Sequence, residues 1–140
     1  MKNYKQFYLD QIKTQWRPLF EEYNKNNNTA LEKLLMDTQR YIRIMPKNIQ
    51  EPEKIAEYIT EKIKDEFTIP TKMGDRNQIA LNANIQSILP KIKKQIIQFH
   101  KNFIEFADIK NENEIRNLFR EALIYCIGIS KLYMCSPLKI

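Results

Sequence analysis

The sequence predicts an all-α protein, a single-domain bundle of about five helices over residues 1–140, with kinks near Pro18 and Pro90. Three observations support this fold class. Apolar residues recur at intervals of three and four along almost the whole chain, the spacing of a helix with one buried face. No segment alternates apolar and polar residues as a half-buried strand would. The length of 140 residues fits one domain that can bury its own core.

The first two predicted helices are separated by an Asn-rich loop at residues 26–28. The apolar face of the first helix consists of Tyr8, Ile12, Trp16, Leu19, Phe20 and Tyr23. Because Pro18 falls within it, a kink or a short break is expected near Arg17. The segment Thr29–Glu32 has the capping-box pattern that begins a second helix. The buried face of that helix comprises Leu31, Leu34, Leu35, Thr38, Tyr41, Ile42 and Met45. Pro46 ends it, since the residue before a proline disfavours helical geometry.

The third helix is bounded by prolines. Pro52 suits the first position of a helix, where no N–H is needed, and Pro70 terminates the segment. Its apolar face is Ile55, Ile59, Ile63 and Phe67. The opposite ridge carries Glu53, Glu57, Glu61 and Asp65 at intervals of four. Such a row is expected to be solvated surface or a contact for a basic partner, because a cation prefers a more convergent set of oxygens.

Residues 70–78, with the Gly74-Asp75 turn signal, form the longest expected loop. The fourth helix is expected to begin between Asn77 and Asn84. Its apolar face keeps one phase through Pro90, which predicts one kinked helix or two nearly collinear helices. The face comprises Ile85, Ile88, Leu89, Ile92, Ile96, Phe99, Phe103 and Phe106.

The fifth helix is capped by Asn111–Glu114 and closed by Pro137. Its apolar face is Ile115, Leu118, Phe119, Ala122, Cys126, Ile129 and Tyr133. From Ala122 to Cys135 the helix is apolar on nearly all sides, so it is either a central core helix or partly covered by a partner or a second copy. The candidate partner-binding residues are Leu123, Ile124, Ile127 and Met134, with Ile97 and Ile104 as a docking ridge on the fourth helix.

Positive charge is concentrated in parts of the chain. The net charge is +6, and no acidic residue occurs between Arg76 and Ile104. On a helical wheel Lys91, Lys94, Gln98 and Lys101 form one exposed row opposite the apolar face. Such a row is either an ordinary solvated face or a surface for a phosphate backbone, which lysines bind without reading sequence. Arg76, Arg40 and Arg43 are further candidates, and Lys47 lies just beyond Arg40 and Arg43. Arg116 and Arg120, one turn apart, form another basic cluster.

Residues for catalysis or metal binding are scarce. The chain has two Gly, one His and two Cys, and it contains no phosphate-binding loop, dinucleotide-binding or zinc pattern. His100 has no carboxylate in helical phase with it, and both Cys126 and Cys135 lie in an apolar helix that disfavours a thiolate. We therefore expect no enzyme activity, no cofactor and no metal site.

These features favour a non-enzymatic helical subunit of a multi-protein assembly that contacts a nucleic-acid backbone, RNA or DNA, through a basic helix face without sequence readout. The alternative is a protein-only adaptor or inhibitor whose bundle binds a helix of a partner protein. Other subunits or further copies of the chain are the expected protein partners. No signal-peptide pattern and no apolar stretch long enough to span a membrane is present, so an intracellular location (cytoplasm or nucleus) is expected.

Overall fold

The fold is an all-α bundle, as the sequence predicts. A computed structural model describes residues 3–24, 28–67 and 76–135, and within them it contains five helical stretches and no strand. The first stretch is divided into α1 (Tyr4–Gln11), a π-helical turn η1 (Ile12–Trp16) and α2 (Arg17–Asn24). It is followed by α3 (Asn28–Ile44), α4 (Pro52–Phe67), α5 (Arg76–Ala107) and α6 (Glu112–Cys135).

The π-helical turn η1 lies where the sequence predicts a kink or a break. The N–H of Arg17 donates to the carbonyl of Ile12, five residues earlier. A proline ring in a regular helix clashes with the carbonyl four residues before it, which for Pro18 is that of Thr14. The wider turn accommodates Pro18 without ending the helix, and it keeps Ile12 and Trp16 fully buried.

Helix ends follow the capping residues with small differences. Pro52 is the first residue of α4, and the side chain of Asn111 accepts a hydrogen bond from the N–H of Glu114 at the start of α6 (3.1 Å). The second helix begins at Asn28, so the expected capping box at Thr29 lies inside the helix and the predicted Asn loop is too long by one residue. Of the loop expected over residues 70–78, residues 76–78 belong to α5, which begins at Arg76, and residues 70–75 lie outside the described residues.

Helix α5 continues through Pro90 as one helix of 32 residues. Pro90 cannot donate to the carbonyl of Gln86, but the ladder resumes beyond it because the apolar face keeps its phase from Ile88 to Phe103. Asp108 follows the helix with a φ of 50°, a left-handed conformation that ends the helix and that Asp tolerates better than most residues.

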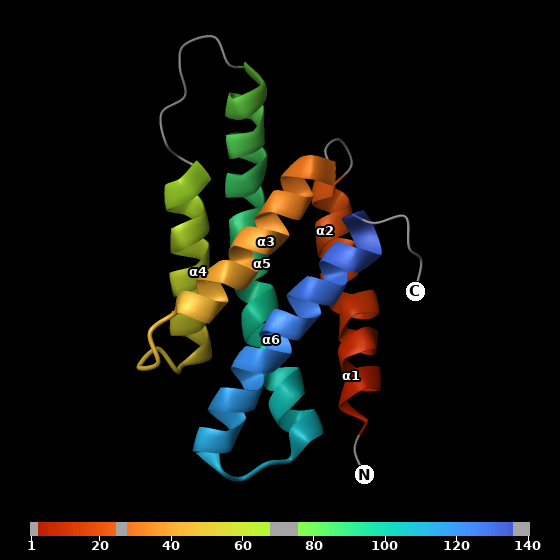
Figure 1. Ribbon diagram of the computed structural model, residues 1–140, viewed down its shortest axis with the longest axis vertical. Coiled ribbons are helices and arrows are strands. Elements are labelled where there is room, and N and C mark those ends of the chain that lie inside the picture. Colours follow the sequence, from red (N-terminus) through yellow and green to blue (C-terminus); the bar gives the residue numbers. More distant parts are fainter. Residues whose placement is uncertain (1–2, 25–27, 68–75, 136–140) are drawn as a thin grey trace.

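The helices pack in a nested order. Helices α4 and α5 pair with each other, while α3, which precedes them, packs along α6, which follows them. In Figure 1, α3 and α6 cross in front of α5, and α1 and α2 run along the side of the bundle. The first stretch closes the core by contacting both α5 and α6.

The core is densest in a cluster of aromatic rings between α1, η1, α5 and α6. Phe99 lies at its centre, with ring centroids 6.3 Å from Phe7, 6.0 Å from Trp16, 6.4 Å from Phe103 and 5.9 Å from Phe119. These distances fall within the range in which aromatic pairs attract beyond simple burial. Residues from four separate segments are thereby held around one ring.

Helices α3 and α6 approach closely at Gly128. The side-chain amide of Gln39 donates to the backbone carbonyl of Ile124 across this contact (3.0 Å). A Cβ atom at position 128 would lie 2.6 Å from that amide nitrogen, so a larger residue there would require the flexible Gln39 side chain to shift. None of the helices in residues 3–24, 28–67 and 76–135 is both long enough and apolar enough to cross a membrane.

Candidate functional site

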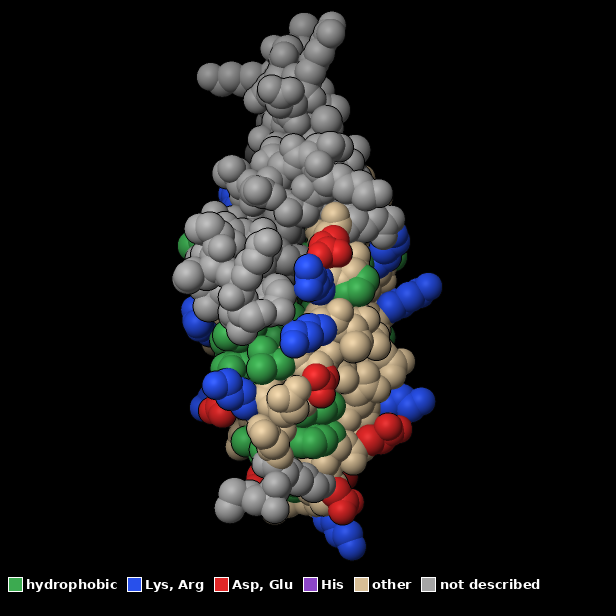
Figure 2. Space-filling model, turned by 90° about the vertical axis from the view of Figure 1, so that its right-hand side faces the viewer, with side chains coloured by type: hydrophobic (Ala, Val, Ile, Leu, Met, Phe, Trp, Pro, Cys, Tyr) green, Lys and Arg blue, Asp and Glu red, His purple; other side chains and the backbone are tan. Residues whose placement is uncertain are grey.

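The outer face of α5 carries the four residues that we call the α5 lysine row. Lys91, Lys94, Gln98 and Lys101 are all exposed, on the side opposite the buried Ile and Phe side chains. At 1.5 Å per residue, the ten steps from Lys91 to Lys101 span about 15 Å along the helix axis. In Figure 2, Lys and Arg side chains project separately along the right-hand edge, which is the back of the molecule in Figure 1.

The lysines of the row differ from the amide in their contacts. Gln98 donates to the side-chain oxygen of Asn102 (2.8 Å), and Asn102 donates to Gln11 of α1 (2.9 Å). This chain of amides fixes α1 against α5 beside the row. Lys94 and Lys101 make no ion pair or hydrogen bond with any described residue, so their ammonium groups are available to a ligand. The exposed Glu105, one turn beyond Lys101, marks the end of the basic stretch.

The other basic candidates do not extend the row. Arg40 lies on α3, where its guanidinium is 3.5 Å from the Asp37 carboxylate and stacks over the Tyr41 ring at 5.0 Å. Arg43 is exposed on the same helix. Arg76 begins α5, but its side chain lies outside the described ones. The structure therefore does not bring the arginines of α3 onto the surface formed by the α5 lysine row (Figure 1).

The apolar candidates divide between the core and the surface. Leu123 and Ile127 are each 1% exposed, because α6 packs against α3 and also against the α1–α2 stretch and α5. They belong to this chain's own core, so the proposal that they form a partner surface does not fit their position. Ile97 and Ile124 are half-buried against the core. Ile104 is 37% exposed, and the side chain of Met134 lies outside the described ones.

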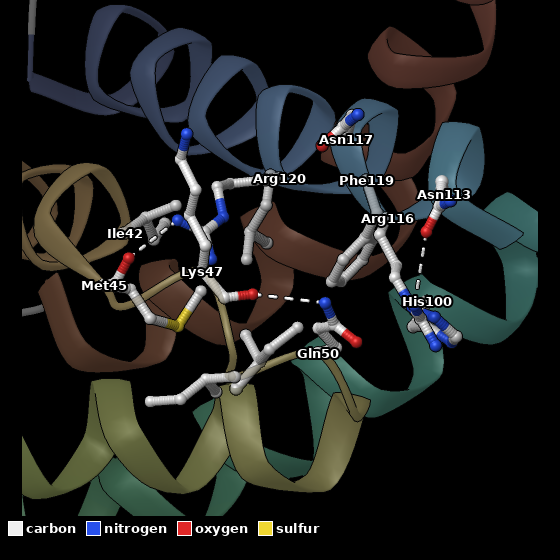
Figure 3. A pocket seen from close by; sticks show the side chains of 13 residues that line it. Ile42, Met45, Lys47, Gln50, His100, Asn113, Arg116, Asn117, Phe119 and Arg120 are labelled. Atoms are coloured by element: carbon white, nitrogen blue, oxygen red, sulfur yellow. Dashed lines mark hydrogen bonds between the residues drawn. The ribbon is translucent and has the colours of Figure 1, made fainter.

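A pocket that the sequence does not predict lies where α3 ends and α4, α5 and α6 meet. Its volume is about 290 Å³, and its polar lining includes Lys47, Arg116, Arg120 and His100. We call it the cationic pocket (Figure 3). Lys47 and the two arginines are separate clusters in sequence, and His100 is expected only at the flank of its helix. The one local signal is the polar spacing of Asn113, Arg116, Asn117 and Arg120 on α6.

Arg120 holds one wall of the pocket in place. Its guanidinium donates to the carbonyls of Met45 (2.8 Å) and Pro46 (3.1 Å), just beyond the end of α3. Both carbonyls lie beyond the last helical residue, Ile44, and that of Pro46 also accepts from the N–H of Ile49 in the following turn (3.1 Å). Arg120 is thus a link between α6 and the α3–α4 connection. Arg116, one turn earlier, makes only long contacts, 3.6 Å to Glu112 and 3.5 Å to Asn113.

His100 is half-buried beside the Phe119 ring, whose centroid lies 4.7 Å away in an edge-to-face arrangement. Burial lowers the pKa of His100 below its ordinary value of 6.5, and the negative charges of Glu53 and Glu51 oppose this effect only in part. The imidazole is therefore neutral at pH 7, with one donor and one acceptor nitrogen.

We expect the free energy of unfolding to fall as the pH is lowered from 7.5 to 5. The unfolded chain binds a proton at His100 more readily than the folded chain does, so stability present above pH 6.5 is lost as the pH drops toward the folded pKa. Urea denaturation at both pH values measures this loss. His100→Gln, which removes the titrating group, is expected to show a smaller fall, and equal falls in the two proteins would refute this role of His100.

Two other titratable side chains with shifted pKa values are Cys126, which is buried in the core, and Tyr8, which is half-buried against it. Burial raises the pKa of the Cys126 thiol far above its ordinary value, so this thiol stays protonated, as expected from its apolar helix. The side chain of Cys135 lies outside the described ones. The pKa of Tyr8 is raised to about 12, first by burial and then by the neighbouring Cys126 and Tyr4. Within the described residues, no three His, Cys, Asp or Glu side chains converge on a possible metal position.

Two surfaces thus emerge from the geometry, the α5 lysine row and the cationic pocket. Comparisons of this chain with protein-family models, with curated proteins and with solved structures give no match.

Proposed function

We propose that this chain is a non-enzymatic helical subunit that contacts the backbone of a nucleic acid through the α5 lysine row. The observation that carries the proposal is the exposure of Lys91, Lys94 and Lys101 along one helix face with no carboxylate between them. The row spans about 15 Å, a length comparable to about four phosphates of one strand at 3.4 Å per nucleotide.

The chemistry of the row supports backbone contact rather than base readout. A lysine ammonium is a flexible point charge that attracts phosphate without demanding a fixed geometry. Base readout usually depends on bidentate arginine or amide contacts, and Gln98, the amide of the row, already donates to Asn102. No aromatic side chain stands in the row to stack on a base. Binding is therefore expected to be insensitive to sequence.

Fluorescence anisotropy with labelled duplex DNA and with RNA tests the proposal across a salt series. With three phosphate contacts, the slope of log K against log salt for duplex DNA is expected to be about −3. Replacing Lys94 and Lys101 by Gln is expected to weaken binding to all sequences and to make the slope shallower by about 2. The control Lys54→Gln with Lys62→Gln removes the same charge from α4 and is expected to leave the slope unchanged.

The proposal fails if neither DNA nor RNA binds at 50 mM salt, or if the α4 control weakens binding as much as the α5 variant. The first outcome would remove nucleic acid as a ligand. The second would show that net charge, rather than the position of the row, determines attraction to a polyanion.

A second candidate is the protein-only adaptor, which the exposed apolar side chains of α3 favour. Ile44 is 60% exposed and Met36 is 50% exposed on the outer face of this helix, next to Arg40 and Arg43. Apolar contacts of this kind change little with salt, whereas backbone contacts weaken steeply. Binding of a partner protein that persists from 50 mM to 500 mM salt and is lost in Ile44→Ser would favour this candidate.

A further inference from the structure

The cationic pocket lies between the α3–α4 connection, α5 and α6. None of the residues of the α5 lysine row lines it. In Figure 3, Arg116 extends from α6 toward His100 on α5, and Gln50 of the α3–α4 connection lies beside them, with its amide donating to the carbonyl of Lys47 (3.3 Å). Lys47 and Arg120 lie at the opposite end of the same view. Side chains from three parts of the chain thus surround one space of about 290 Å³.

The pocket is lined by more positive than negative charge, although Glu51 and Glu53 act electrostatically on His100 in its lining. Lys47, Arg116 and Arg120 line it, and none of its lining residues is Asp or Glu. The nearest acidic partner of Arg116 is Glu112, whose side chain is 82% exposed and whose oxygen lies 3.6 Å away, so this pair contributes little. Lys47 is exposed and makes no side-chain contact with a charged group in the described part of the chain.

The roles of the two arginines differ. Arg120 already donates to two backbone carbonyls, so its charge is held in place and two of the five N–H donors of a guanidinium are used. Arg116 has only contacts of 3.5 Å and 3.6 Å, which leaves its guanidinium able to bind an oxyanion through two parallel N–H groups. The pocket therefore has one fixed cation and two cations, Arg116 and Lys47, that are not held by short bonds.

The floor of the pocket is apolar. Met45, Phe119 and Leu123 lie beneath the pocket, almost fully buried, and the half-buried Ile49 adds apolar surface beside them. The amides of Gln50, Asn113 and Asn117 complete the rim. A concave apolar floor with a few converging polar groups is the usual form of a small-molecule site.

We propose that the cationic pocket binds a small organic anion that carries one phosphate or carboxylate group on an apolar body. Arg116 contacts the anionic group beside His100, while Lys47 and Arg120 add positive charge from the opposite end of the pocket, and the apolar body lies on the floor between them. This site is separate from the α5 lysine row and does not depend on nucleic-acid binding.

Titration of isotope-labelled protein with four probes, followed by amide chemical shifts, tests the proposal. The probes are 1-naphthyl phosphate, 1-naphthoate, neutral 1-naphthol and inorganic phosphate. At least one of the two naphthyl anions is expected to bind with a dissociation constant of about 1 mM or tighter, shifting the amides of residues 45–50 and 113–120. Naphthol and inorganic phosphate, which each lack half of the ligand, are expected to bind about tenfold more weakly.

The two anions distinguish the source of the charge. Tighter binding of naphthyl phosphate would assign the pocket to phosphate esters, and tighter binding of naphthoate would assign it to carboxylic acids. If neutral naphthol bound as tightly as the naphthyl anions, the proposal would be overturned, because the cations would then contribute nothing. If inorganic phosphate bound as tightly as the naphthyl anions, the proposal would also be overturned, because the apolar floor would then contribute nothing.

Variants locate the site. Arg116→Gln is expected to weaken binding of the naphthyl anion about tenfold, the usual cost of losing a charged hydrogen bond, and Lys47→Gln is expected to weaken it less, because Lys47 lies at the opposite end of the pocket. Lys94→Gln, a matched loss of charge in the α5 lysine row, is expected to leave anion binding unchanged. Unchanged affinity in both pocket variants, or no saturable shift with either anion, would refute the site. Neither result would bear on the α5 lysine row, whose own variants are tested with DNA and RNA.

Discussion

Replacing Phe99 by Ala is expected to lower the free energy of unfolding by about 3–5 kcal/mol. The side chain is fully buried, and its ring is surrounded by those of Phe7, Trp16, Phe103 and Phe119. Truncation removes the buried apolar area and leaves a cavity between α1, η1, α5 and α6. Urea denaturation followed by circular dichroism measures the loss.

The matched control for Phe99 lies on the same helix. Lys93→Ala removes an exposed side chain of α5 and is expected to change stability by about 0.5 kcal/mol or less. Similar losses in the two variants would contradict the placement of Phe99 at the centre of the aromatic cluster. A loss in Phe99→Ala with an unchanged dependence on urea concentration would show that the fold itself is retained.

Replacing Arg120 by Met is expected to lower the free energy of unfolding by about 2–3 kcal/mol. The change removes two hydrogen bonds from a charged donor; the carbonyl of Met45 loses this partner, while that of Pro46 keeps the bond from the N–H of Ile49 (3.1 Å). Methionine keeps most of the apolar stem, so the loss reports the bonds rather than packing. Arg120→Lys is expected to recover part of the stability, since one ammonium cannot reproduce the forked geometry of a guanidinium.

Arg116→Met is the control for this second prediction. Arg116 lies one turn earlier on α6 and makes only the long contacts to Glu112 and Asn113. Its replacement is expected to change stability by about 0.5 kcal/mol or less. Equal losses at the two positions, measured by thermal and urea unfolding, would show that the bonds of Arg120 to the α3–α4 connection have no special weight.

Most of the fold follows from local pattern. A helix needs only its own backbone bonds and one apolar face, so the spacing of Ile55, Ile59 and Ile63 is sufficient to place α4 and its buried side. The errors lie at helix ends, at Asn28 and Arg76, where a cap competes with one more turn of helix. The π-helical turn is a similar case, because proline predicts a disturbance but not the form it takes.

The candidate site follows from sequence only where it lies on one helix. The α5 lysine row is such a case, since helical spacing alone places its four residues on the exposed side. The cationic pocket depends on how separate helices pack, and no spacing relates Lys47 to Arg116. The burial of Leu123 and Ile127 is likewise decided by the neighbours of α6 and not by its own sequence.

The nested order of the helices has a consequence for how the chain reaches its fold. Gln39 and Ile124, which join α3 to α6, lie 85 residues apart in sequence, so meeting directly would require closing a long loop. Helices α4 and α5 are adjacent in sequence and can pair as a hairpin first. Once formed, that hairpin brings the end of α3 close to the start of α6 and shortens the effective loop. Early pairing of α4 with α5 would therefore allow the outer pair to assemble rapidly.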